Sequence, residues 1–155
     1  MSVRFGKIID KMPTNLKLLL EQPPITIDKI GITKLPQKGI YVFFEDNKPI
    51  YVGRSNRLKE RLKEHSSSSA DHYSATLAFR IAKKSASAIQ IRAKKQTNEQ
   101  LMKNSDFVKK FKAAKERISR VRIRYIPIED QIEQAIFEIY AHLELDTELN
   151  DFNTH

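Results

Sequence analysis

Two tyrosines, an arginine and a histidine between residues 41 and 65 have the types and spacing of a cluster in which hydrogen-bonding cations face phenol groups. Tyr41 and Tyr51 lie in two apolar stretches joined by turn residues, so we expect them on the two strands of a hairpin, facing each other on one side of it. Arg61 and His65 follow in an amphipathic segment, within about 60° of its leucine-bearing side. A solvated helix keeps its cations outside, whereas these two are predicted to point toward the sheet. Arg54, just after the second stretch, falls on the same side.

The elements that must position these side chains are predicted from the residue pattern. Residues 39–44 are β-branched and aromatic and predict a buried strand, residues 50–52 predict a second short strand, and residues 45–49 are turn formers. Ser55 can cap a helix that runs to about His65. An alternative interpretation gives the four residues structural roles, as core aromatics, a snorkelling arginine and a histidine at the core edge.

The rest of the pattern completes an α+β fold. A short helix capped by Thr14 is predicted to end at Pro23-Pro24, and residues 25–38 are expected to be extended or looped. Further helices are predicted at 71–85, at 97–118 and from about Glu129, and a strand with arginines on its outer face at 120–126. Together these elements predict a small antiparallel three-stranded sheet flanked by helices, with a basic helical insertion.

Charge is unevenly distributed along the chain, which has 28 Lys and Arg, 19 Asp and Glu, and a net charge of +9. Residues 66–124 hold 15 basic and 4 acidic side chains, whereas residues 125–155 hold 8 acidic ones and no Lys or Arg. A basic protein of this kind favours nucleic acid as its partner. An acidic element within it can hold a divalent cation beside phosphate, although pairing with lysines is the simpler role for most of its acids.

Glu138 and Glu133 are the candidate metal ligands in this acidic segment. Apolar residues recur in it at helical spacing, so we expect a packed helix and not a disordered tail; they are Ile132, Ala135, Ile136, Ile139, Tyr140 and Leu143. Glu138 lies opposite this main stripe, within a second strip of apolar residues. A carboxylate in such surroundings is protonated or paired unless a cation is present. Glu133, at the border of the main stripe, is the alternative.

Two short residue runs resemble the name motif of the GIY-YIG nuclease superfamily. They are Gly39-Ile40-Tyr41 and Tyr51-Val52-Gly53, with ten positions from Tyr41 to Tyr51. The resemblance extends to Arg54, Arg61 and His65, which lie three, ten and fourteen residues after Tyr51. Near the C-terminus, Glu138 followed twelve residues on by Asn150 is similar to the closing helix of the family. The resemblance covers residues 39–65 and about 121–153, whereas the connection between them is longer than in compact members.

The resemblance implies hydrolysis of phosphodiester bonds in DNA with one bound ion, Mg²⁺ or Mn²⁺. Glu138 is then expected to bind the ion, which takes its other oxygen ligands from water and substrate. Arg61 is expected to clamp the phosphate as a planar donor. Asn150, or alternatively Asn153, would brace the site.

The same resemblance implies that the tyrosines and the histidine handle the attacking water. Tyr41 would orient or deprotonate it, and because an ordinary tyrosine has a pKa of about 10, a base in this position needs nearby cations. Tyr51 would hydrogen-bond near the water or the phosphate, and which tyrosine is the base stays open. His65 would accept or relay the proton.

We predict one nuclease domain over residues 1–155, with a helical or extended N-terminal extension (1–38) and a basic helical insertion (66–118). The insertion is expected to grip the DNA backbone, where phosphate contacts give affinity and register. The candidate substrate-binding residues are Arg54, Arg57, Lys94, Lys95, Lys109, Lys110, Arg122 and Arg124.

The alternative function is a catalytically silent nucleic-acid-binding protein that retains the nuclease fold. The absence of cysteine excludes disulfides, thiolate catalysis and Cys-based zinc sites. No apolar run approaches the roughly 18 residues of a membrane span, and the N-terminus has no apolar signal segment, so a cytoplasmic protein without a membrane partner is expected. A homodimer and an accessory protein that supplies target specificity are the further partners considered.

Overall fold

Two compact units make up the chain, which we describe from a computed structural model over residues 1–86 and 96–152. The first unit is Met1–Arg61 with Val121–His155, and the second is Leu62–Arg120. The second unit contains the predicted insertion, residues 66–118. The prediction of one domain with an N-terminal extension stays a prediction.

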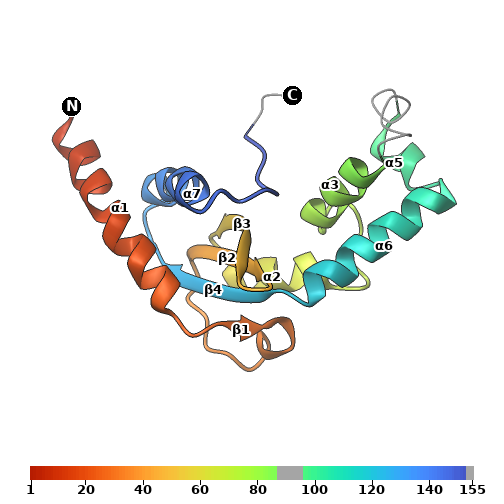
Figure 1. The fold of residues 1–155 in the computed structure, drawn as a ribbon, viewed down its shortest axis with the longest axis horizontal. Helices are drawn as coiled ribbons and strands as arrows, with labels where there is room; N and C mark the ends of the chain where they lie inside the picture. Colours follow the sequence, from red (N-terminus) through yellow and green to blue (C-terminus); the bar gives the residue numbers. More distant parts are fainter. Residues whose placement is uncertain (87–95, 153–155) are drawn as a thin grey trace. The chain divides into compact units, whose positions relative to one another are not determined.

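The first unit is built on a four-stranded antiparallel sheet (Figure 1). Its strands are β1 (Ile25–Thr26), β2 (Gly39–Glu45), β3 (Lys48–Ser55) and β4 (Arg122–Pro127), in the order β1-β4-β2-β3. The α+β character and the antiparallel sheet are confirmed, but the count of three strands is wrong. The missed strand β1, followed by the short 3₁₀ helix η1 (Ile27–Lys29), has two residues and therefore no alternation to detect.

The β2–β3 hairpin fixes the register of the two tyrosines. Its turn lies at residues 46–47, both with positive φ (49° and 64°), as a two-residue hairpin turn with the right twist requires. Tyr41 pairs with Gly53, and Phe43 pairs with Tyr51. The tyrosines therefore share a face but lie on a diagonal, and the expectation that they face each other directly is wrong. A bulge next to Phe43 shifts the pairing by one residue relative to the turn.

Helices α1 (Val3–Glu21) and α7 (Gln131–Leu145) pack against one face of this sheet (Figure 1). The core between them and the strands contains Ile8, Met12, Leu19, Ile40, Val42, Phe44, Val52, Ile126, Phe137 and Ala141. The cap of the first helix is Ser2, twelve positions before the predicted cap at Thr14, and its Oγ accepts the Phe5 N–H at 3.2 Å. Pro13 lies inside this helix, where burial of the apolar face outweighs the missing backbone donor.

Helix α7 exposes part of the apolar stripe that the sequence predicts to be buried. Ile132, Ile139 and Leu143 are 50%, 48% and 69% exposed, whereas Phe137 and Ala141 are fully buried. The weaker of its two apolar strips is therefore the more deeply buried, and Ile136 and Tyr140 of the main stripe pack partly against the same core. The helix is packed, as predicted, but Glu138 belongs to the border of its packed side and not to the side opposite the core.

The second unit contains α3 (Thr76–Ser85), α5 (Asn98–Leu101) and α6 (Ser105–Ser119), with α3 packed on α6. Its core is aromatic: the Phe79 ring lies edge-on to Phe107 and Phe111, at centroid distances of 5.2 and 5.8 Å. Helix α2 (Leu58–Ser66) begins in the first unit and continues into the second. None of the helices in the described ranges is long and apolar enough to cross a membrane.

Two predicted helices of this unit have different bounds in the structure. The helix expected at 97–118 is broken, because Asn104 Oδ1 accepts the N–H groups of Asp106 and Phe107 at 3.0 and 3.1 Å and caps α6 anew. The helix expected at 71–85 begins at Thr76. The residues before this helix form a turn, in which Asp71 Oδ1 accepts the N–H groups of Tyr73 and Ser74, both at 3.0 Å.

Candidate active site

Tyr41 lies at the centre of the candidate site. Its side chain is 1% exposed, and its Cζ and Oη atoms occupy the space where a Cβ atom on Gly53 would lie. Gly53 is therefore required for a close approach and not for its backbone angles. Because β3 is the edge strand, the absence of a side chain at Gly53 lets the phenol of Tyr41 cross over β3 toward the edge of the sheet.

Three groups of the first unit surround this phenol. The Tyr51 ring lies 6.1 Å from the Tyr41 ring, centroid to centroid, at an interplanar angle of 52°. Arg61 donates a hydrogen bond to the Tyr41 hydroxyl, and the carboxylate of Glu138 is close enough to act on its ionisation. Tyr41, Tyr51, Arg61 and Glu138, which the sequence singled out, come from four separate elements and are neighbours around one hydroxyl group.

Burial raises the pKa of Tyr41 well above its ordinary value. The hydroxyl of Tyr51 raises this pKa further, whereas the guanidinium of Arg61 lowers it through its charge and its hydrogen bond, and Glu138 raises it. The effect of burial on the pKa of Tyr41 is larger than the opposite effect of the Arg61 guanidinium. The phenol of Tyr41 is therefore neutral in this protein and can orient a nucleophile through hydrogen bonds.

Glu138 is positioned by α7 and held by Arg54. Arg54 Nε lies 2.9 Å from Glu138 Oε2, and the carboxylate side chain is 18% exposed. The alternative ligand, Glu133, is engaged elsewhere: it accepts from Lys11 Nζ at 3.0 Å and from Asn15 Nδ2 at 3.3 Å. Of these two carboxylates, Glu138 is the one beside Tyr41.

Asn150 fixes the C-terminal segment to the outer edge of β3. Its Oδ1 accepts the Val52 N–H at 2.9 Å, and its Nδ2 donates to the Val52 carbonyl at 2.8 Å. Leu149 N adds a backbone bond to Ile50 O at 3.0 Å. The amide thus pairs with β3 as a neighbouring strand would, which suits a bracing residue.

The other candidate residues are distributed over both units. His65 is fully buried one turn after Arg61 on α2, and it belongs to the second unit. Arg57 is exposed at the start of α2, where its N–H is held by Ser55 Oγ at 3.0 Å. Lys94, Lys95 and Asn153 lie outside the described residues.

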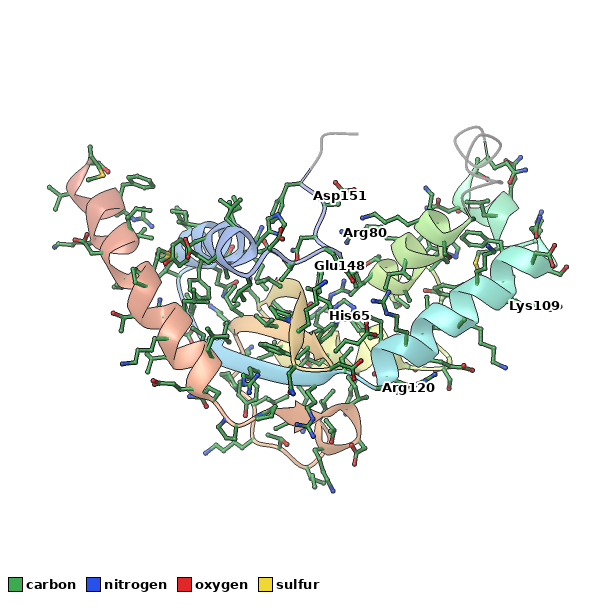
Figure 2. The ribbon with its side chains drawn as sticks, in the orientation of Figure 1. His65, Arg80, Lys109, Arg120, Glu148 and Asp151 are labelled. Atoms are coloured by element: carbon green, nitrogen blue, oxygen red, sulfur yellow. The ribbon has the colours of Figure 1, made fainter. Side chains whose placement is uncertain are left out.

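Two candidates for substrate binding have structural partners instead. Arg124 Nε donates to Gln22 O at 2.9 Å, and its guanidinium lies 4.6 Å from the Phe44 ring centroid. It therefore covers the face of the sheet that carries α1, whereas Arg122 is exposed. Lys110 Nζ donates to Ser85 O at the end of α3, at 3.0 Å. By contrast, Lys109 projects from the side of α6 that faces away from α3 (Figure 2).

Sequence reasoning missed two residues that support the site, Thr147 and His142. Thr147 is 2% exposed and donates to Asn150 Oδ1 at 2.7 Å, and His142 Nδ1 lies 2.8 Å from its hydroxyl. Neither residue belongs to a recognisable motif. Only the left-handed turn at Asp146 (φ 49°), which reverses the chain after α7, brings them together.

The donor set suits a cation held by a single carboxylate. Within the described residues no group of three or more His, Asp or Glu side chains could enclose a metal ion. Mg²⁺ is commonly held by one or two carboxylates and completes its shell with water and phosphate oxygens. Glu138 beside Tyr41 and Arg61 fits that pattern, with the substrate supplying the remaining oxygens.

A family model described as the GIY-YIG catalytic domain matches residues 37–138, more than half of the chain. The match begins just before β2 and ends at Glu138, so it includes Tyr41, Tyr51, Arg61 and the second unit. Comparisons with curated proteins and with solved structures find no match. The motif, the geometry around Tyr41 and the family match agree, and the chain belongs to the GIY-YIG superfamily, whose members are nucleases.

Proposed function

We propose that this chain is a metal-dependent endonuclease that hydrolyses phosphodiester bonds in DNA. The observation that carries the proposal is the convergence of Tyr51, Arg61 and Glu138 on the hydroxyl of Tyr41. A fold kept only for binding would have no need of a buried phenol, a planar phosphate donor and a carboxylate around one point. The alternative, a catalytically silent binding protein, is an outcome of the experiment below.

In the proposed reaction each side chain has a separate task. Arg61 binds the scissile phosphate, for which its fixed fork of donors is suited. Tyr41, kept neutral by burial, orients the attacking water, and Tyr51 donates to the water or to the phosphate. Glu138 would hold one Mg²⁺ or Mn²⁺ ion, which when bound stabilises charge on the phosphate and on the leaving oxygen. His65 remains the candidate proton acceptor.

Arg54 has a place in this proposal because of its ion pair with Glu138. A metal ion bound at Glu138 would compete with this guanidinium for the carboxylate. The released side chain, which is 45% exposed, is then available to the phosphate backbone on either side of the scissile bond.

The second unit is proposed to bind the DNA backbone through its outward cations. Lys109 and Lys112 are exposed on α6, whereas Lys115 bonds to two backbone carbonyls, Ser68 O and Ala70 O, at 2.8 and 3.0 Å. If about six cations of the protein contact phosphates, log K should fall against log salt with a slope of about −5. Replacing Lys109 and Lys112 by alanine should reduce the steepness by about two, and a slope near zero in the parent protein would contradict this role.

The decisive experiment measures cleavage of supercoiled, linear, branched and single-stranded DNA with Mg²⁺, with Mn²⁺ and with EDTA. We expect cleavage that requires the metal and that is abolished by Tyr41→Phe, Arg61→Ala and Glu138→Ala in folded protein. The matched control is Glu144→Ala, an exposed acid on the same helix. Full activity of Glu138→Ala would refute the metal assignment, and salt-dependent DNA binding without any cleavage would favour the silent binding protein.

A further inference from the structure

A continuous series of hydrogen bonds connects the C-terminal turn of α7 to the edge strand β3. His142 Nδ1 lies 2.8 Å from Thr147 Oγ1. Thr147 Oγ1 donates to Asn150 Oδ1 at 2.7 Å. Asn150 in turn holds both the N–H and the carbonyl of Val52, at 2.9 and 2.8 Å. Thr147 is 2% exposed, so water does not compete for its hydroxyl.

The direction of every bond in this series follows from the number of available protons. Asn150 Oδ1 has no proton, so it accepts from both the Val52 N–H and the Thr147 hydroxyl. Thr147 has one hydroxyl proton, which is given to Asn150. The bond to His142 must therefore be donated by its Nδ1–H. The Val52 N–H and carbonyl fix the orientation of the Asn150 amide, because a reversed amide would bring two donors together at the N–H. The Thr147 hydroxyl adds a second donor to the same amide oxygen and so holds the amide in place.

The two ends of the series lie next to the proposed catalytic groups. His142 is one helical turn after Glu138 on α7, so the two side chains share one side of the helix. Val52 directly follows Tyr51 on β3. The series therefore spans the junction between the helix that carries the carboxylate and the strand that carries the second tyrosine. At that junction β3 has no further strand, so the outward N–H and carbonyl of Val52 depend on Asn150.

We propose that Thr147 and His142 are positioning residues, which hold Asn150 against the Val52 backbone and so keep Glu138 and Tyr51 in register at the same phosphate. The proposal rests on the proposed nuclease function for its catalytic consequence. The linkage itself, from His142 to the Val52 amide, is independent of that function. Two readouts therefore separate the two claims.

The first readout is hydrogen exchange of the Val52 amide in the full chain without metal or DNA. We compare Thr147→Val, which keeps the shape but removes the hydroxyl, with Thr147→Ser, which keeps the hydroxyl. Val52 should lose protection in Thr147→Val and keep it in Thr147→Ser. His142→Leu should also lose protection, and His142→Asn, whose amide N–H can donate from a similar position, should keep most of it. The matched control is Thr33→Val, which loses a hydroxyl bond to Lys29 O far from this junction in the sequence.

The second readout is the separation of kcat from KM on the DNA that the parent protein cleaves best. A misplacement of a catalytic group by about 1 Å can cost about 100-fold in rate. We expect kcat of Thr147→Val to fall by that amount with KM within twofold, and Thr147→Ser to recover it. Unchanged Val52 protection in Thr147→Val, or equal losses in the valine and serine variants, would overturn the proposal. A parent protein that cleaves nothing, but whose Val52 protection follows the hydroxyl, would refute the nuclease function and leave the linkage supported.

Discussion

Replacement of Gly53 by alanine would place a methyl group in the space that the Tyr41 ring occupies. The added Cβ would lie 2.8 Å from Tyr41 Cε1 and closer still to Cζ and Oη. Carbon atoms in contact are normally about 3.5–4.0 Å apart, so the ring must retreat by on the order of 1 Å. The backbone at Gly53 is not in the left-handed region, so alanine adds no strain of its own. The perturbation is therefore confined to the phenol and its partners.

Displacement of the Tyr41 ring should lower the free energy of unfolding moderately and the cleavage rate more strongly. Overpacking a filled core typically destabilises by about 1–3 kcal/mol. Because Tyr41 bonds to Arg61, a shift of the phenol also moves the proposed nucleophile-orienting group, and a displacement of about 1 Å can cost about 100-fold in rate. We expect urea unfolding to show the moderate loss and the DNA cleavage assay to show the large one, with the variant still folded.

Gly31→Ala is the matched control, because nothing lies within 4 Å of the Cβ that it would add. Its stability should be unchanged or raised by about 0.4–1 kcal/mol, since alanine restricts the unfolded chain, and its cleavage rate should equal that of the parent. A Gly53→Ala protein with the stability and the kcat of the parent would refute the reasoning. A loss of kcat in Gly31→Ala of similar size would show that the assay reports general destabilisation.

Three further outcomes follow from described contacts. Asn104→Ala should lower the free energy of unfolding by about 1 kcal/mol in urea, because α6 loses the cap on two N–H groups, and an unchanged midpoint would contradict that role. Tyr41 has a raised pKa in the folded protein, so its contribution to stability is full below pH 10 and is lost as pH rises above it; Tyr41→Phe should flatten this alkaline decline in a thermal-melt series. The pKa of Asp130 is held below its usual range, first by the N–H of Glu133 and then by the N–H of Ile132 and by Arg4. The contribution of Asp130 to the free energy of unfolding is therefore present above about pH 4 and is lost on acidification. In a thermal-melt series, the stability of Asp130→Asn should decline less steeply at acid pH than that of the parent.

The hairpin and its helix could be predicted from the sequence because their signals are local. A run of β-branched and aromatic residues, turn formers and a capping serine are all read within residues 39–65. The inward side of α2 followed from helical geometry alone, and Leu58, Leu62 and His65 are indeed fully buried. These are cases in which local preference and tertiary packing agree.

The remaining features depend on contacts between distant segments. The stripe of Ile132, Ile139 and Leu143 has the stronger apolar pattern, yet the fully buried residues of α7 are Phe137 and Ala141 on the opposite strip. The start of α1 depends on burial of Ile8 and Met12 beneath α7 and the sheet. Glu138 could be selected over Glu133 only with the resemblance, since the partners of Glu133 lie on a helix more than a hundred residues away.

The position of β4 in the sheet has a consequence for the order of folding. β4 pairs with both β1 and β2, so an inner strand of the first unit comes from residues that follow the second unit in the chain. During synthesis the β2–β3 hairpin must wait for it with an unsatisfied edge, which is a template for association with other chains. Contacts between α3 and α6 are comparatively local and are expected to form faster than the pairing of β4. Once the second unit has folded, the loop that must close before β4 pairs with β2 is effectively shorter. Variants that loosen the aromatic core of the second unit should therefore slow refolding of the sheet.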